Sequence, residues 1–294
     1  INQANAVINR AESITDMDAA TKNTRIAEAR FLRALAYFNL TRHFGDIHLS
    51  LEETEGVEIT ANKTTSSEIY AKAIIPDLEF AILNLEDNPS DYGRASIPAA
   101  QFLLAKVLLT RSYTSFAAGD DASKAETLMS SVISNPQFSL LDKFSDLWKI
   151  ENERNSEFIW TIQNSKSQVD EGLDSYGHRA HLYFLMEYDK KPAMTRDIEN
   201  GRPWKRFRPT DHLLSLWDRT KDRRYDETFK HVWYANTTAI PGIAIGDTAL
   251  YIPGPGLNKN GIDQDGLWTD AKKAEKLYQI YTTGDYTNRT FPSL

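Results

Sequence analysis

Apolar residues in the first half of the chain recur every three or four positions, the spacing of amphipathic helices. Between Ile26 and Phe44 two apolar stripes run side by side, which predicts a helix that is packed on two sides. Arg42 and His43 in its last turn suit the negative end of a helix, and Gly45 suits a left-handed cap. We therefore expect this helix to end at Phe44.

The same spacing predicts three further helices. Capping boxes, in which a Ser or Thr precedes a Glu by three positions, begin at Thr65 and Ser123 and predict helix starts there. Another helix is predicted over residues 98–113. Pro76 lies inside the helix that follows Thr65, so it removes a backbone donor and should kink that helix near Lys72.

A repeated pattern suggests how these helices are arranged. Segments Phe31–Ala34 and Phe102–Ala105 share the pattern Phe-Leu-x-Ala and lie 71 residues apart, close to two tetratricopeptide repeats of about 34 residues each. Ala at a crossing point allows helices to approach closely, which favours stacked helical hairpins. An irregular helical bundle explains the periodicity equally well. The expected fold class is mainly α, with tetratricopeptide-like helical hairpins in an α-α superhelix.

The pattern changes after residue 150. Residues 157–163 alternate like a short strand or an extended packing segment, and Pro209–Asp211 marks the start of a helix. Residues 151–294 hold five of the six Trp, and most of this half is rich in loop-forming and aromatic residues. We predict a tetratricopeptide-like helical scaffold over residues 1–150 and a loop-rich ligand-binding region over residues 151–294, packed on the same fold.

Composition excludes several classes of protein. Hydrophobic residues at 41% and charged residues at 26% are globular values. No apolar run approaches the roughly 20 residues of a membrane-spanning helix. The absence of Cys excludes disulfides, iron–sulfur clusters and thiolate zinc sites. The net charge of −7 argues against a general nucleic-acid binder.

Aromatic residues between positions 176 and 233 indicate sugar binding, because flat rings pack against the C–H faces of sugars while polar groups bond to their hydroxyls. We predict Tyr176, Trp204 and Trp233 as stacking residues, and His178 and Arg206 as hydroxyl partners. Trp204 is the first choice because neighbouring Gly and Pro place it on a turn. Further candidates of the same two kinds are Tyr183, Phe207, Asp174, Asn200 and Arg202. Burial in the core is the alternative for each ring.

Charge and spacing refine this picture. Positive side chains gather in sequence around Trp204, and they either favour an acidic sugar or balance neighbouring acids. They are Arg196, Arg202, Lys205, Arg206 and Arg208. Trp217 and Phe229 lie beside apolar helical positions, so we expect both in the core.

No cofactor or catalytic residue is expected. His178 and His181 form a His-x-x-His pair, but no His-Glu-x-x-His sequence occurs. Asp263–Gly266 resembles part of a calcium loop, yet Ala274 stands where an EF-hand needs Glu, so only an irregular calcium site stays open. The chain contains no nucleophile elbow, P-loop or dinucleotide-binding Gly pattern. These patterns favour binding over catalysis.

The string Ala27–Phe38, followed by Phe44–Ile47, resembles the SusD/RagB family of bacterial outer-membrane nutrient-binding lipoproteins. Other segments occur in the order found in this family: Ile1–Ile8 before that string, then Ile75–Glu79, Gly93–Ala95, Asn155–Trp160, Arg208–Thr210 and Asp222–Tyr225. The resemblance spans nearly the whole chain. No ligand-binding residue can be carried over by motif, because the family builds its site from poorly matched loops.

The resemblance implies a helical, tetratricopeptide-like protein at the cell surface, held to the outer membrane by an N-terminal lipid anchor that this chain lacks. It implies non-catalytic binding of oligosaccharides or polysaccharides for delivery to a TonB-dependent transporter of the SusC type. In the RagB branch the ligand is a peptide. The alternative from another class is a helical-repeat scaffold with only protein partners. We expect the chain to be a fragment that lacks the lipidated start and the C-terminal helices of the family.

Overall fold

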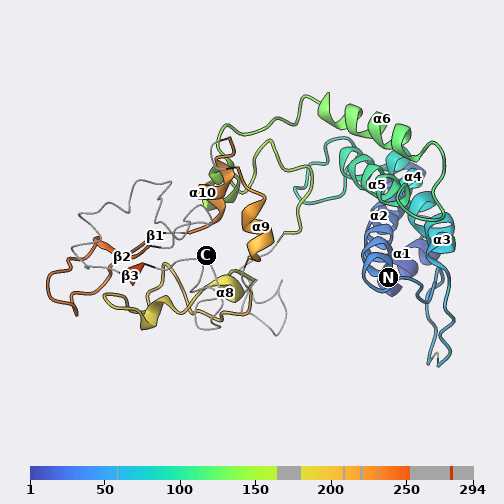
Figure 1. Ribbon diagram of the computed structural model, residues 1–294. Helices are drawn as coiled ribbons and strands as arrows, with labels where there is room; N and C mark the ends of the chain where they lie inside the picture. Colours follow the sequence, from blue (N-terminus) through green and yellow to red (C-terminus); the bar gives the residue numbers. More distant parts are fainter. Residues whose placement is uncertain are drawn as a thin grey trace. The chain divides into compact units, whose positions relative to one another are not determined.

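The computed structural model describes residues 1–57, 59–163, 180–207, 209–218, 221–230, 232–251 and 279–280 (Figure 1). The chain divides into two compact units. Unit 1 comprises Ile1–Asp142 and Ile150–Gln163, and unit 2 comprises Lys143–Lys149 and Asn164–Leu294. Unit 1 is helical, and unit 2 combines short helices with a small sheet, so the expectation of a mainly α fold is confirmed.

Unit 1 is built from helices that pack on their neighbours in sequence. Its elements are α1 (Asn2–Ala11), α2 (Ala19–Phe44), α3 (Ser66–Ile69), the π-helical turn η1 (Tyr70–Ile74), α4 (Ile75–Asn84), α5 (Ile97–Arg111), α6 (Asp121–Ile133) and the 3-10 turn η3 (Ile150–Asn152). Helix α1 packs on α2, α2 on α4, α4 on α5, and α5 on α6 (Figure 1).

The long helix α2 ends where the sequence predicts but begins earlier. Asp18 caps its start by accepting a hydrogen bond from the Thr21 N–H at 2.9 Å. Gly45 ends it with a φ of +70°. Its first residues, Ala19 to Thr21, are exposed and include no large apolar side chain, so no apolar stripe marks the start. Further along, Phe31 and Phe38 are almost fully buried in the core of unit 1.

The disturbance predicted from Pro76 takes the form of a π-helical turn. The Thr65 side chain caps α3 as predicted, accepting from the Glu68 N–H at 3.3 Å. Helix α3 then passes into η1, and Pro76 falls in the first turn of α4. Proline is tolerated in a first helical turn because its missing N–H needs no partner there. The wider turn of η1 therefore gives Pro76 the start of a new helix.

Helices α5 and α6 form a hairpin held by a buried ion pair. Ser96 caps α5 by accepting from the Ala99 N–H at 3.3 Å. Helix α6 begins at Asp121 with Asp120 as its N-cap, so the cap predicted at Ser123 is wrong by three residues. The reason lies in the tertiary structure, because the fully buried Asp121 carboxylate receives Arg111 Nε at 2.9 Å.

A buried polar cluster joins α1, α2 and α4. The Arg33 guanidinium donates to both carboxylate oxygens of Asp77, at 2.7 and 2.8 Å. It also donates to Asn5 Oδ1 at 2.9 Å, and Asn5 in turn donates to the carbonyls of Ser50 and Glu52. Arg33, Asp77 and Asn5 are all at most 5% exposed. One buried cation thus connects three helices and the loop that follows α2.

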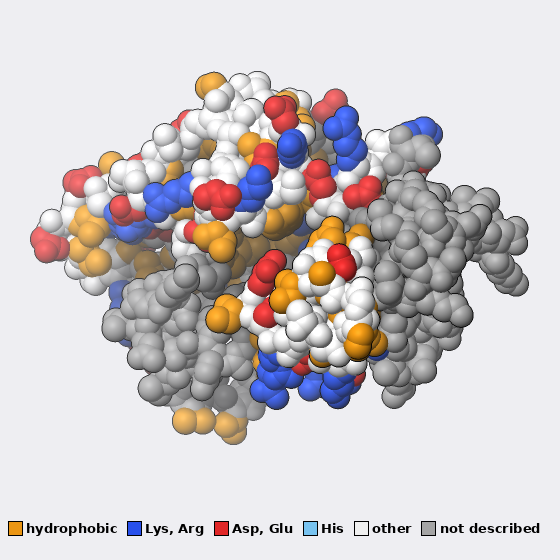
Figure 2. Space-filling model, turned by 90° about the vertical axis from the view of Figure 1, so that its left-hand side faces the viewer, with side chains coloured by type: hydrophobic (Ala, Val, Ile, Leu, Met, Phe, Trp, Pro, Cys, Tyr) orange, Lys and Arg blue, Asp and Glu red, His pale blue; other side chains and the backbone are white. Residues whose placement is uncertain are grey.

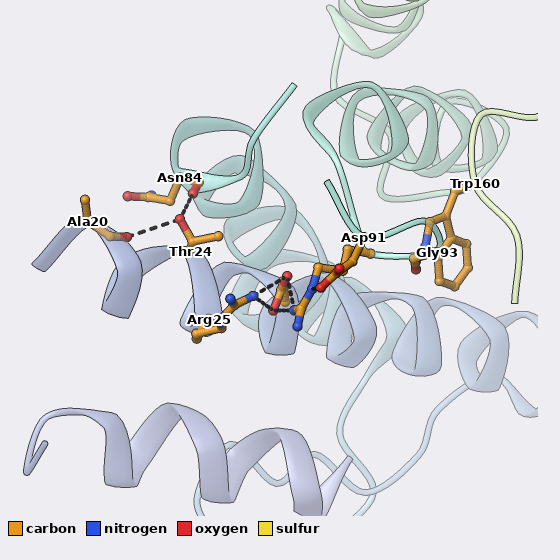
Figure 3. A network of polar contacts seen from close by, with 9 residues as sticks. Ala20, Thr24, Arg25, Asn84, Asp91, Gly93 and Trp160 are labelled. Atoms are coloured by element: carbon orange, nitrogen blue, oxygen red, sulfur yellow. Dashed lines mark hydrogen bonds and ion pairs between the residues drawn. The ribbon is translucent and has the colours of Figure 1, made fainter. Parts of the chain in front are cut away.

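The 157–163 segment closes unit 1 as an extended packing segment and not as a strand. Trp160 donates from Nε1 to the Gly93 carbonyl at 2.9 Å, and its ring meets Phe31 edge to face at 5.1 Å. Nearby, Arg94 bridges Glu28 of α2 and Asp91 of the loop before α5. Figure 3 shows this network, with Trp160 and Gly93 at one end.

Unit 2 contains elements that the sequence pattern did not predict. Strand β1 (Val232–Tyr234) pairs antiparallel with β2 (Thr248–Tyr251), and β2 pairs parallel with β3 (Gln279–Ile280). Its short helical elements are η2 (Phe144–Trp148), α8 (Ala180–Phe184), η4 (Tyr188–Lys190), α9 (Asp211–Ser215) and α10 (Arg224–Thr228). Strands of two to four residues are too short to give a recognisable alternation.

Two sequence-based expectations for unit 2 are confirmed. Helix α9 starts beside Thr210, whose side chain accepts from the Leu213 N–H at 3.1 Å. Phe229 is 8% exposed and packs with Leu214 and Tyr225, while Trp217 lies against the same cluster. Over the described part of the chain, every helix is too short or too polar to cross a lipid bilayer.

The buried ion pair of α2 and α4 predicts a large effect on stability. Asp77→Ala leaves the Arg33 charge buried without its carboxylate, so we expect the free energy of unfolding to fall by about 3–5 kcal/mol. Urea unfolding followed by far-UV circular dichroism measures this. Lys72→Gln is the control, since the Lys72–Glu68 pair is exposed and should contribute at most about 1 kcal/mol. Equal effects of the two variants would contradict an anchoring role for Asp77.

The Arg111–Asp121 pair predicts a pH dependence of stability. Burial opposes ionisation of Asp121, but hydrogen bonds from Arg111 and the Ala118 N–H outweigh it and hold the pKa below its ordinary value of 3.8. The stabilisation is therefore present above that value and is lost as the pH falls through the lower pKa of the folded state. We expect the free energy of unfolding to decline below about pH 4 more steeply in the wild type than in Asp121→Asn. Parallel curves would contradict this assignment.

Candidate functional site

Four aromatic side chains of unit 2 lie together at the end of α8, and we call them the aromatic cluster: Tyr183, Phe184, Trp204 and Phe207. The Tyr183 ring meets Trp204 edge to face at 4.9 Å and Phe207 at 5.6 Å. Phe184 lies 5.4 Å from Phe207. Phe184 and Phe207 are each 53% exposed, and Tyr183 and Trp204 are half-buried. The aromatic cluster therefore exposes two of its rings to solvent, while the other two are partly packed within the protein.

Backbone hydrogen bonds hold this cluster in place. The last carbonyls of a helix have no partner within it, and here the chain at residues 204–207 supplies donors to α8 and to the residue that follows it. The N–H of Trp204 donates to Leu182 at 2.9 Å, and the N–H groups of Arg206 and Phe207 donate to Tyr183 at 2.7 and 3.0 Å. The Lys205 N–H donates to Leu185 at 3.1 Å. The rings are thus placed by backbone contacts.

The turn that carries Trp204 contains two residues with positive φ. Gly201 has a φ of +76°, and a Cβ there would lie 3.2 Å from a methyl carbon of Leu182. Lys205 has a φ of +42°, which is uncommon for a residue with a side chain. Its ammonium pairs with Glu187 at 2.7 Å. Hydrogen bonds from Lys205 and Lys190 lower the pKa of Glu187, so the carboxylate remains charged and continues to hold the turn.

The predicted site residues have different outcomes. Trp204 and Arg206 lie in or next to the aromatic cluster, together with the further candidates Tyr183 and Phe207. Tyr176 and His178 lie outside the described residues. Phe184 was not predicted as a site residue; the only signal for it was the aromatic pair Tyr183–Phe184, which alone does not distinguish core from surface.

Trp233 lies in the core, which corrects its prediction as a stacking residue. It is 2% exposed and stacks on Tyr188, with the ring centres 5.1 Å apart and the planes at 17°. The Lys230 ammonium lies 4.1 Å from its ring centre. A ring covered in this way has no free face for a sugar. Its position in β1 explains the burial, because the middle residue of this strand points into the core.

The polar candidates also differ in whether they are available to bind a ligand. Asn200 donates from its side chain to both oxygens of Asp197 and accepts from Lys230 at 2.6 Å, so it is part of the turn's own structure. Arg202 and Arg206 are exposed. Asp174 lies outside the described residues.

Most of the candidate metal ligands lie outside the described residues. His178 and the sequence around Asp263–Gly266 lie outside them, and the side chain of His181 is not described. Within the described ranges no group of three or more His, Asp or Glu side chains is arranged to hold a metal ion. The chemistry of the aromatic cluster is therefore that of exposed rings beside guanidinium groups, which suits stacking and hydrogen bonding.

Comparisons with known proteins agree with this architecture. Residues 1–109 match a family described as "Starch-binding associating with outer membrane". A SusD-like protein of Bacteroides ovatus is 35% identical over 168 residues, which is 55% of this chain and 31% of the relative.

Two solved structures are also similar. A structure determined with a xylogluco-oligosaccharide is 27% identical with a TM-score of 0.61, covering 74% of this chain and 42% of that one. A laminarin-binding SusD-like protein is 30% identical with a TM-score of 0.51, covering 57% and 36%. The chain thus spans about a third of the curated relative's length and less than half of either solved chain.

These matches define the class as a tetratricopeptide-like helical fold, which confirms the helical-hairpin expectation for unit 1. The chain is similar to SusD-like proteins over the ranges given above. The matched range 1–109 lies within unit 1, so the aromatic cluster lies outside it.

The different positions of Trp233 and Phe207 predict different effects of truncation. Trp233→Ala should lower the free energy of unfolding by about 3–5 kcal/mol, because it opens a cavity in the core of unit 2. Phe207→Ala should cost less than about 1 kcal/mol, because the ring is half exposed. Urea titrations of both variants measure the difference. A mild effect at Trp233 would contradict its assignment to the core.

Proposed function

We propose that this protein binds oligosaccharides without cleaving them, through the aromatic cluster of unit 2. The observation that carries the proposal is the group of exposed and half-exposed rings, Phe184, Phe207 and Trp204, fixed on backbone hydrogen bonds beside Arg206. The named ligands of two similar solved proteins, a xylogluco-oligosaccharide and laminarin, support a glycan as the ligand class.

The cluster suits capture because little has to be ordered when a sugar arrives. A sugar ring presents C–H groups on its faces and hydroxyls on its edge, and an aromatic face covers the first while guanidinium groups reach the second. The backbone bonds at Arg206 and Phe207 are already made, so binding costs little conformational entropy in the main chain. Rings that sit side by side can also contact successive units of an oligosaccharide.

We further propose the setting that the family resemblance implies. The complete protein would sit on the outer face of the outer membrane through an N-terminal lipid anchor and would deliver its glycan to a TonB-dependent transporter of the SusC type. Binding without bond cleavage fits this role, because the ligand must reach the transporter intact. The similarity of residues 1–109 to the outer-membrane starch-binding family, and of the chain to a SusD-like protein, supports this setting.

Trp204→Ala should abolish or strongly reduce glycan retention while leaving the fold intact. Affinity electrophoresis of the 294-residue chain in gels containing xyloglucan, laminarin and an acidic polysaccharide measures this. Trp148→Ala is the matched control, because Trp148 is 66% exposed and lies outside the aromatic cluster. Near-UV circular dichroism checks the fold of both variants. Phe207→Ala serves as a second test if Trp204→Ala disturbs the structure.

Three results would overturn the proposal. Retention that survives in both Trp204→Ala and Phe207→Ala would show that the aromatic cluster is not the binding surface. Release of smaller sugars, detected by chromatography of the same mixtures, would contradict binding without cleavage. Retention of peptides in place of any glycan would assign the chain to the peptide-binding branch of the family.

A further inference from the structure

The region around the aromatic cluster carries an excess of positive charge. Residues 187–207 contain six Lys and Arg against four Asp and Glu, in a chain whose net charge is −7. In Figure 2, Lys and Arg side chains gather at the lower edge of the described surface, next to exposed hydrophobic side chains. The question is which of these cations are already neutralised.

Several of the cations are paired within the protein. Lys205 and Lys190 both bind Glu187, at 2.7 and 3.0 Å. Arg196 binds Asp189 at 2.6 Å. These carboxylates are therefore already engaged.

A third carboxylate is engaged by amides. Asp197 accepts from the backbone and side chain of Asn200 at 2.8 and 2.9 Å and also from the Asn236 side chain. These hydrogen bonds, acting against burial, hold the pKa of Asp197 below its ordinary value, so it stays charged. The partners in these hydrogen bonds are amides and not guanidinium groups.

Lys191 also interacts within the protein and lies in the field of the Glu187 charge, so Arg202 and Arg206 remain. Both are exposed, and within the part of the chain that the structure describes neither guanidinium has an ion-pair or hydrogen-bond partner. Arg206 is fixed next to the rings, because its N–H donates to Tyr183 at 2.7 Å and its neighbour Phe207 belongs to the aromatic cluster. An exposed guanidinium without a protein partner, on a residue whose backbone is fixed next to aromatic rings, can offer two parallel donors to a carboxylate or sulfate.

We propose that the ligand of the aromatic cluster is an anionic glycan, bearing carboxylate or sulfate groups, and that Arg206 binds the acidic group with assistance from Arg202. This inference rests on the proposed function, since it specifies the ligand class of the same surface. The rings pack on the sugar faces, and the guanidinium forms charge-assisted hydrogen bonds with the acid. A neutral glycan would offer the guanidinium only hydroxyl groups and would bind more weakly.

The test is isothermal titration calorimetry of the 294-residue chain with three probes: an oligogalacturonate for carboxylate, a sulfated galactan oligosaccharide for sulfate, and a neutral laminari-oligosaccharide. We expect tighter binding of at least one acidic probe than of the neutral one. Arg206→Gln should weaken that binding by about tenfold, the loss typical of a charge-assisted hydrogen bond. Binding of the neutral probe should weaken much less, because its hydroxyls accept hydrogen bonds without a charge of their own.

Lys221→Gln is the matched control for net charge. Lys221 is exposed, pairs only weakly with Asp218, and lies outside the 187–207 region. If Lys221→Gln weakens acidic binding as much as Arg206→Gln does, the effect is long-range attraction and the assignment of Arg206 is overturned. Raising the salt from 50 to about 500 mM should reduce a merely long-range effect most strongly.

The outcomes separate this inference from the proposed function. Equal affinity for neutral and acidic probes, with loss of both in Trp204→Ala, would overturn the anionic ligand class and leave glycan binding standing. Acidic binding that is unaffected by Arg206→Gln and by the double variant Arg202→Gln/Arg206→Gln would overturn the role of both residues. No binding of any of the three probes, together with no retention in the polysaccharide gels, would contradict the proposed function itself.

Discussion

The helical unit depends on one buried cation. Arg33 is 5% exposed, so in an apolar core its charge would cost several kcal/mol if it were unpaired. Asp77 from α4, Asn5 from α1 and the loop after α2 meet at its guanidinium. Each of these partners comes from a different part of the chain, so none can move away without leaving a charge or a polar group unsatisfied. The main effect of the Arg33–Asp77 pair is therefore to fix how the helices pack against one another. Its net contribution to the free energy of unfolding is the smaller effect.

Much of unit 1 follows from the sequence because its helices carry their own signals. The caps at Thr65 and Ser96 and the stop at Gly45 act locally, through side chains and backbone a few residues apart. The exceptions arise where distant contacts prevail. Helix α6 starts at Asp121 and not at Ser123 because a partner on α5 binds the Asp121 carboxylate, and no local pattern contains that information.

Unit 2 is less predictable for the same physical reason. Trp204 and Phe207 can be chosen as candidates because Gly201 and neighbouring residues indicate a turn, and the structure brings them to one aromatic cluster. Trp233 has a similar composition around it, yet it is buried. What separates the two is strand pairing of Trp233 with Leu250, a contact across 17 residues that short strands do not reveal in sequence. The local sequence shows which rings could stack on a sugar, but it does not show whether the folded protein exposes them to solvent.

The 157–163 segment has a consequence for the order in which the protein folds. Unit 1 is discontinuous in sequence, since residues 143–149 belong to unit 2 and the chain then returns to place Trp160 against Phe31 and Gly93. On the ribosome, α1 to α6 emerge well before Trp160 does. The helical hairpins must therefore wait, with Phe31 incompletely covered, until synthesis has passed residue 163. Unit 1 is thus completed by a segment that follows the first residues of unit 2 in the chain.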